Sequence, residues 1–344
     1  LFLYLCDVSV AFWLTVGGLL AVFFTLAAYA TLAERKVSAW IQDRVGPNRV
    51  GPWGLLQPLA DVLKLVWKET FQPAPMYRFL QLLAPVLMVT LAMGAVAILP
   101  LSPHLRLFDG SVGILYLLGV LSLTVYGVSL AGWAAGSKYS LLGGLRSGAQ
   151  TISYELALGL ALLSVILLTG HRLPQANPLS PTSIVEAQRG GWYVLLNPLG
   201  FLIYVIAAFA EANRAPFDFA EAEQELVGGY HTEYSSIRFG AFYVAEYMNL
   251  ITASALISTL FFGGYLGPFE GFWGVSKWPI LWQNVWGVAW LLLKTLFWMF
   301  VFMWVRWSIP RFRYDQLMRI GWKVLLPLGV ANLLGLAGIL LVTS

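Results

Sequence analysis

The sequence predicts an all-α integral membrane protein, with about eight transmembrane helices and an amphipathic surface helix after the first of them. Of its 344 residues, 59% are hydrophobic and only 11% are charged, whereas globular proteins have about 25% charged residues. A chain in water could not bury that much apolar surface. Its apolar runs are continuous rather than alternating over about ten residues, which excludes a membrane β-barrel. The single cysteine excludes a disulfide scaffold.

Eight apolar runs are long enough to cross the hydrocarbon core of a membrane, which takes about 20 residues of helix. With an amphipathic helix at 53–69 and an acidic inner connection at 211–238, these runs predict a single membrane domain over residues 1–344. The predicted spans are 10–33, 79–100, 112–135, 148–169, 193–211, 239–266, 281–305 and 322–342.

Residues 53–69 show the spacing of an amphipathic helix. Apolar residues such as Leu59 and Leu63 recur on one helical face, and Asp61 and Lys64 lie on the other. The segment is too short to span a membrane, and it carries charges. We therefore expect it to lie along the membrane surface or against other helices.

The distribution of Lys and Arg predicts the orientation. The first-to-second, third-to-fourth, fifth-to-sixth and seventh-to-eighth connections carry 16 of the 21, and the other connections carry four. Connections rich in these residues face the cytoplasm or the mitochondrial matrix. We expect both termini on the outer side of a bacterial cytoplasmic membrane or a mitochondrial inner membrane. The remaining basic residue, Lys294, lies inside the seventh span.

The chain has few residues that could bind a redox centre. It has one cysteine, Cys6, and three histidines, His104, His171 and His231, all outside the apolar runs. An iron–sulfur cluster takes about four thiolates, and haem takes axial ligands from side chains. We therefore expect no metal-bound or covalent cofactor in this chain, and we interpret His231 as a loop residue.

Three carboxylates fall within or at the ends of spans. They are Glu155 in the fourth span, Glu211 at the end of the fifth and Glu246 in the sixth. A charge at the bilayer centre costs about 2.5–3.5 kcal/mol, so such residues are functional candidates. The predicted orientation puts all three in the inner half, and no acid lies in the outer half of any span. Protons that enter here must therefore leave sideways.

The acidic connection continues this cluster, because six acids lie between 211 and 238 against two arginines. Crowded or buried carboxyl groups can both take up and release protons near neutral pH. In an alternative interpretation, Glu155 or Glu246 is a structural ion-pair partner, for example of Lys294 or Arg146, and the loop acids are solvated or bind a partner. The candidate proton-relay residues are Glu155, Glu211, Asp218, Glu221, Glu223, Glu225, Glu233, Glu246 and Lys294.

Seven separated motifs resemble one known family, the H-subunit family of proton-pumping NADH:quinone oxidoreductase (respiratory complex I), whose mitochondrial member is subunit 1. Together they extend through most of the chain, so the resemblance is specific. The motifs are LAERKV at 32–37, RVGPNRVGP at 44–52, GLLQPLADVLK at 54–64, GWAAGSKYS at 132–140, TISYE at 151–155, RAPFDFAEAEQEL at 214–226 and PRFRYDQL at 310–317.

The resemblance implies a membrane subunit without a redox centre, in which the family forms the quinone entrance chamber and an acidic funnel that couples quinone reduction to antiporter-like subunits. Quinone is the substrate. NADH, flavin and iron–sulfur clusters are expected on hydrophilic-arm partner subunits, and small membrane subunits and lipid surround the chain; nucleic acid is not an expected partner. By similarity, the quinone-binding residues are Glu34, Arg35, Asp61, Lys64 and Arg306.

One position departs from the family pattern. Some bacterial members carry a glutamate in the third span where this chain has Ser122, so the relay lacks one member, and water could bridge Glu155 and Glu211. One alternative is the equivalent subunit of a membrane-bound hydrogenase or a ferredoxin-linked complex. A second is a self-contained proton-coupled transporter, although the sequence shows neither inverted repeats nor interrupted helices. A third is a passive anchor whose acids bind partner loops.

Overall fold

The computed structural model describes residues 10–73, 76–106, 111–221, 223–268 and 278–343, and within these residues it contains helices and no strands. The predicted fold class, an all-α membrane protein, is confirmed. The α-helices are α1 (Val10–Ile41), α2 (Gln57–Trp67), α3 (Arg78–Val96), α4 (Gly113–Ala134), α5 (Lys138–Arg172), α6 (Pro181–Ala187), α7 (Tyr193–Leu196), α8 (Pro198–Glu211), α9 (Glu223–Leu226), α10 (Ser236–Phe261), α12 (Ile280–Ser308), α13 (Tyr314–Arg319) and α14 (Leu326–Thr343).

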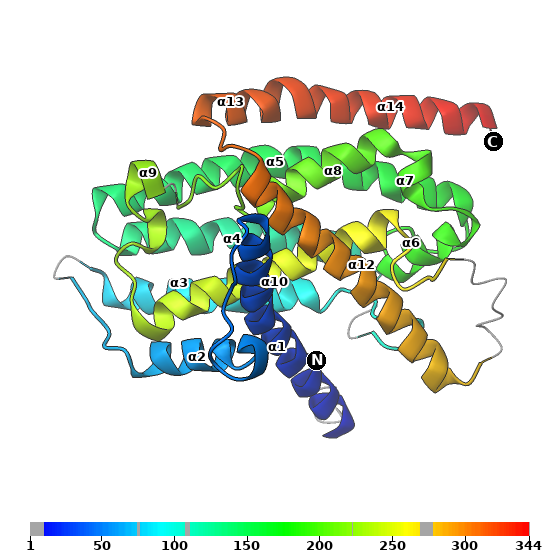
Figure 1. The fold of residues 1–344 in the computed structure, drawn as a ribbon. Coiled ribbons are helices and arrows are strands. Elements are labelled where there is room, and N and C mark those ends of the chain that lie inside the picture. Colours follow the sequence, from blue (N-terminus) through cyan, green and yellow to red (C-terminus); the bar gives the residue numbers. More distant parts are fainter. Residues whose placement is uncertain (1–9, 74–75, 107–110, 222, 269–277, 344) are drawn as a thin grey trace.

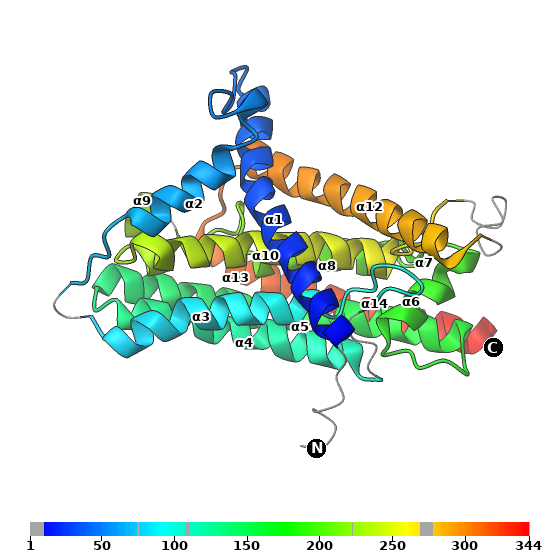
Figure 2. The ribbon, with the colours of Figure 1, turned by 90° about the horizontal axis from the view of Figure 1, so that it is seen from below.

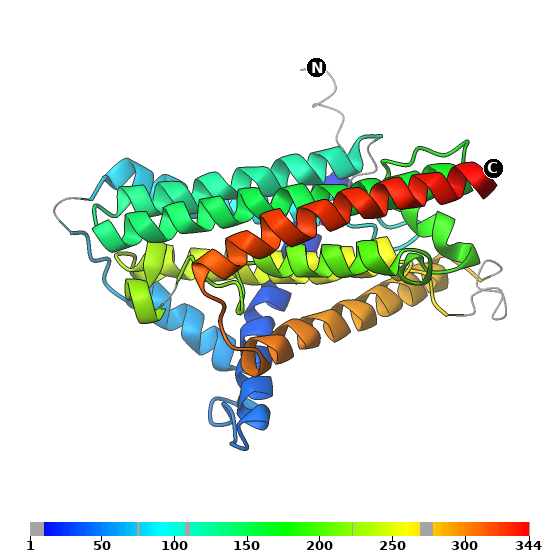
Figure 3. The same ribbon diagram turned by 90° about the horizontal axis from the view of Figure 1, so that it is seen from above.

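The centre of the molecule is a bundle of nearly parallel and antiparallel helices. Helices α3, α4, α5, α8 and α10 lie side by side, and α1 and α12 cross one face of this bundle (Figures 1 and 2). The continuous α13–α14 segment runs diagonally over α5 and α8 (Figure 3). The α4–α5 turn, α9 and the start of α10 lie at one end of the bundle, and α6 and α7 lie at the other (Figure 1).

In the described residues, six helices are long and apolar enough to cross a membrane: α3, α4, α5, α10, α12 and the segment Tyr314–Val342. Their outer faces carry large apolar side chains, for example Leu293 and Phe297 of α12, each 58% exposed. Small residues occupy the inner contact of α5 with α8, where Ala161 and Ala207 are fully buried. Small side chains let membrane helices approach closely.

Helix α8 is shorter than the apolar run at 193–211, because the run is interrupted at Asn197. This residue precedes Pro198, which disfavours helical backbone in the residue before it and donates no backbone hydrogen bond. Asn197 has φ −136° and ψ 65°, and its side chain accepts a hydrogen bond from the Gly200 amide at 2.9 Å. The run therefore forms the short α7 and the 14-residue α8.

A second irregularity lies between α13 and α14, where residues Ile320–Leu325 form a π-helical turn. The turn packs against α5: a Cβ at Gly321 would lie 3.4 Å from the ring of Tyr154, and the Tyr154 hydroxyl donates to the Leu317 carbonyl at 3.0 Å. The sequence pattern indicated neither this turn nor the break at Asn197.

The acidic connection between α8 and α10 folds back onto the bundle. The buried Gln150 of α5 donates to the carbonyls of Ala210 and Phe217, both at 2.7 Å. Further along, Gly229 has φ +63°, and a Cβ there would lie 1.8 Å from the Ala220 carbonyl. Only glycine fits that position. The connection thus holds its acidic side chains against the helices.

Candidate functional site

A cavity of about 400 Å³ lies between α1, α2, α10 and α12. Its wall on α10 is partly aromatic, with Phe239, Tyr243 and Tyr247, and Trp307 of α12 adds a further ring. The polar wall comes mainly from α1 and α2. All five residues predicted to bind quinone line this single cavity: Glu34, Arg35, Asp61, Lys64 and Arg306.

Asp61 organises the α2 side of the cavity. Arg35 of α1 forms an ion pair with it at 2.7 Å, and Lys64 lies 3.8 Å from its other oxygen. The Gln57 side chain also donates to Asp61 at 3.2 Å. Gln57, Asp61 and Lys64 share one face of α2 because residues three or four apart are neighbours on a helix. The cavity therefore presents cationic donors fixed by one carboxylate.

A buried chain of ion pairs begins at Glu34, which is 5% exposed. Its two carboxylate oxygens contact Arg306 of α12 and Arg214 of the acidic connection. Arg214 also pairs with Glu246 of α10, with Nε to Oε1 at 2.8 Å, and its guanidinium lies 4.6 Å from the ring centre of Tyr247. A buried charge needs such partners to offset lost hydration. The chain connects the cavity wall to a predicted relay carboxylate.

The next acids lie around a small cavity, the inner cavity, of about 20 Å³. Glu211, Glu221 and Glu246 line it together with Asn213 and Asn249, among others. Three candidates that are far apart in the sequence therefore share one space.

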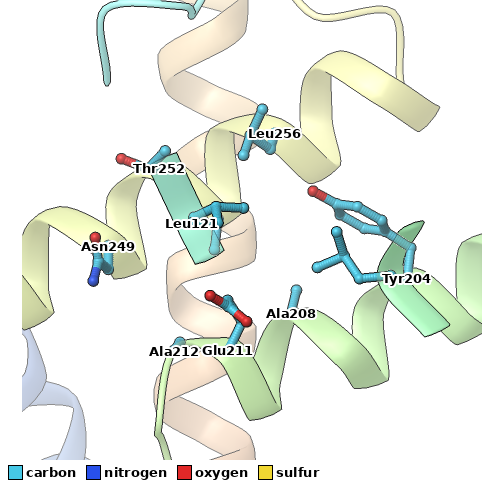
Figure 4. A pocket seen from close by; sticks show the side chains of 10 residues that line it. Leu121, Tyr204, Ala208, Glu211, Ala212, Asn249, Thr252 and Leu256 are labelled. Atoms are coloured by element: carbon cyan, nitrogen blue, oxygen red, sulfur yellow. The ribbon is translucent and has the colours of Figure 1, made fainter. Parts of the chain in front are cut away.

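A second cavity of about 20 Å³, the bundle cavity, begins on the far side of Glu211 and Asn249. It lies between α8 and α10, and Tyr204 and Thr252 contribute its other polar side chains (Figure 4). The Glu211 Oε2 atom is buried and has no hydrogen-bond partner among the described residues.

Burial changes the protonation of the acidic connection. Desolvation, reinforced by the carboxylates of Glu246 and Asp218, raises the pKa of Glu221 well above its ordinary value. Desolvation also raises the pKa of Asp218, although Arg311 pairs with it at 2.7 Å. For Arg214, burial acts to lower the pKa, but Glu246 and Glu34 raise it above its ordinary value. The connection therefore holds a fixed cation beside a carboxyl that is protonated at neutral pH.

His231 lies beside this cluster, with its Nδ1 atom 3.8 Å from Glu221. Burial lowers the pKa of its imidazole to about 4, so the ring is neutral near pH 7. It packs against the rings of Tyr230, Phe239 and Tyr243. In the described residues, no three His, Cys, Asp or Glu side chains are arranged to hold a metal ion.

Other predicted relay residues lie apart from the two small cavities. Glu155 contacts the Ser122 hydroxyl of α4, and its charge acts on Glu211. Glu225 forms an ion pair with Arg146 at 2.6 Å, and its side chain is 56% exposed. Glu233 is half-buried before α10, and the side chain of Glu223 lies outside the described residues.

Lys294 binds backbone carbonyls. Its Nζ atom donates to Phe262 at 2.6 Å, Gly264 at 2.8 Å and Leu266 at 2.7 Å, and it lies 5.4 Å from the ring centre of Trp192. These carbonyls follow the end of α10, where a helix leaves acceptors unpaired. The ammonium thus caps α10, while Arg214 is the cation that pairs with Glu246.

Sequence reasoning did not select Arg214 as a site residue, nor did it select Arg311, Tyr247 or Asn249. A signal for Arg214 was present, because it is one of only two bases among six acids in the connection. A buried acidic cluster needs a nearby cation. The distance between Arg214 and Glu34 in the sequence concealed their pairing.

The fold and the site define a helical membrane protein with a cavity large enough for a small molecule and a buried chain of ionisable side chains that leads away from it. The family model described as NADH dehydrogenase matches residues 14–337. NADH-quinone oxidoreductase subunit 8 of Rhodothermus marinus is 54% identical over 90% of this chain and 92% of its own length. The H subunit of the same enzyme is 50% identical in Salinibacter ruber (93% and 94% covered) and 49% in Protochlamydia amoebophila (90% and 92%).

The chain therefore belongs to the NADH dehydrogenase family, and the resemblance to the H-subunit family of NADH:quinone oxidoreductase is confirmed.

Replacing Arg214 should strongly destabilise the protein. Arg214→Met leaves Glu34 and Glu246 without their shared cation, and breaking a buried pair in this way costs about 3–5 kcal/mol. Arg146→Met is the control, because its partner Glu225 is exposed and such pairs contribute about 0–1 kcal/mol. Thermal unfolding in native membranes measures both. Equal melting temperatures would contradict the buried network.

The raised pKa of Glu221 predicts a pH-dependent effect of Glu221→Gln. A carboxyl whose pKa rises on folding destabilises the folded state as pH increases from the ordinary value of 4.5 towards the raised value. Glutamine removes that cost. The variant should therefore be at least as stable as wild type near about pH 7, with the difference shrinking towards about pH 5. A variant less stable than wild type throughout this range would show that Glu221 is ionised in the folded protein.

Proposed function

We propose that this chain is the membrane subunit of a proton-pumping NADH:quinone oxidoreductase that forms the quinone entrance chamber and carries charge from it to neighbouring subunits. The observation that supports this most directly is the ion-pair chain from Glu34 through Arg214 to Glu246. It joins a residue of the large cavity to a residue of the inner cavity.

The large cavity has the chemistry that an amphiphilic quinone requires. A quinone has an apolar tail and a headgroup whose carbonyl oxygens accept hydrogen bonds. The aromatic α10 wall offers apolar contact, and Arg35 and Arg306 offer charged donors, which form the stronger hydrogen bonds. Electrons arrive from redox centres on partner subunits. Reduction then adds two electrons and two protons to each quinone molecule.

Charge moves from the chamber through shared partners. Glu34 and Glu246 compete for one guanidinium, that of Arg214. A change in charge beside Glu34 alters how strongly Arg214 holds Glu246, which in turn changes the electrostatic potential at Glu221 and Glu211. Because no predicted span has an acid in its outer half, protons from this cluster pass sideways to antiporter-like subunits. Both termini lie on the outer side of the membrane.

Two alternatives are separated by simple observations. If the chain belongs to a hydrogenase or ferredoxin-linked complex, it should co-purify with a nickel–iron hydrogenase or with ferredoxin-dependent activity instead of NADH activity. The names of the similar proteins favour the NADH enzyme. If the chain is a passive anchor, neutralising its buried acids should leave proton pumping intact.

Arg35→Ala should raise the apparent KM for quinone by about tenfold, because it removes a charged hydrogen-bond donor worth about 1.5 kcal/mol. The matched control is Arg189→Ala: its side chain is 55% exposed, compared with 49% for Arg35, and it pairs with Glu186 away from the cavity. Steady-state quinone reduction in native membranes measures both. Kinetics unchanged by Arg35→Ala would remove this residue from the quinone site.

Glu155→Gln combined with Glu246→Gln should reduce the number of protons pumped per NADH to less than about half, because neither amide can carry a proton. Glu186→Gln, which neutralises a half-exposed acid of α6, is the control. Pumping is measured in sealed vesicles alongside quinone reduction. Normal pumping by the double variant would favour the passive anchor.

A further inference from the structure

The inner cavity and the bundle cavity share part of their walls. Glu211, Ala212 and Asn249 line both. The inner cavity continues to Glu221 and Glu246. The bundle cavity continues along α8 and α10 to Tyr204 and Thr252 (Figure 4).

The facing surfaces of α8 and α10 explain why this space exists and why it is polar. On α10, Glu246, Asn249 and Thr252 follow one another at steps of three residues, so they lie on neighbouring turns of one face. On α8, Ala208 and Ala212 supply small side chains opposite them. Small residues leave room, and the side chains that border it can donate or accept hydrogen bonds.

Each cavity matches a water molecule in size and in chemistry. A cavity needs about 10–15 Å³ to hold one water, which also requires two to four polar partners. Both measure about 20 Å³. The buried and unpartnered Glu211 Oε2 atom supplies a strong acceptor. The Asn249 carboxamide offers two donor hydrogens and an acceptor oxygen without carrying a charge.

We propose that each cavity binds one water molecule, and that Asn249 positions both waters so that they connect Glu246 and Glu221 to Glu211, and Glu211 to Thr252 and Tyr204. The inference rests on the proposed proton route and adds a residue to it. A protonated Glu246 gives its proton to the inner water, and that water passes one of its own protons to Glu211. The water is regenerated, and Asn249 itself takes up no proton.

The proposal is tested on the intact enzyme complex with Asn249→Leu and Asn249→Ser. Leucine fills the space and removes every hydrogen-bonding group, so pumping per NADH should fall by about tenfold. Serine keeps a hydroxyl and leaves room for water, so it should retain at least about half of the pumping. Asn332→Leu makes the same chemical change in α14, away from both cavities, and should pump normally. Electron entry from NADH to an artificial acceptor should be the same in all three.

An experimental structure of the wild-type complex in which waters are resolved gives a second readout, independent of pumping. We expect one water in each cavity at about 2.7–3.2 Å from Asn249. Dry cavities, normal pumping by Asn249→Leu, or equal loss in the leucine and serine variants would each overturn the proposal. If the Glu155 and Glu246 double variant pumps normally, the proposed function fails. If it fails to pump while Asn249→Leu pumps normally, only this inference fails.

Discussion

The guanidinium of Arg214 is the contact on which the rest of the site depends. It is almost completely buried, lies over the ring of Tyr247, and is shared by Glu34 of α1 and Glu246 of α10. These interactions offset the cost of burying its charge. Because Arg214 belongs to the acidic connection, the same contact fixes that connection between α1 and α10. The wall of the large cavity and the acids of the inner cavity therefore share one anchor.

A related constraint governs the irregular segments, because backbone polar groups inside a membrane protein need partners. Gln150 satisfies two carbonyls around the acidic connection. Gln188 donates to the Thr259 carbonyl and accepts from the Gly263 amide at the end of α10. Lys294 caps the same end with three hydrogen bonds. Polar residues within apolar runs here largely serve the interrupted backbone, and only some of them face cavities.

The sequence predicted most of this architecture where the signal was local. Apolar runs located the long helices, the spacing of Leu59 and Asp61 located α2, and motif similarity selected five residues that share one cavity. The failures were non-local. Lys294 looked like a partner for acids because a lone charge in a span suggests one, but it binds backbone carbonyls. Pairing across 180 residues, as between Glu34 and Arg214, leaves no periodic pattern.

Ser122 shows how the relay tolerates a missing carboxylate. Its oxygen lies within hydrogen-bond distance of both the Glu155 carboxylate and the Leu118 carbonyl, at 2.8 Å for the latter. A serine has one hydroxyl proton but can also accept. When Glu155 is ionised, Ser122 donates to it. When Glu155 is protonated, it donates to Ser122, whose own proton turns to Leu118. A neutral hydroxyl thus stabilises both protonation states, whereas a second carboxylate at this position would repel the ionised one.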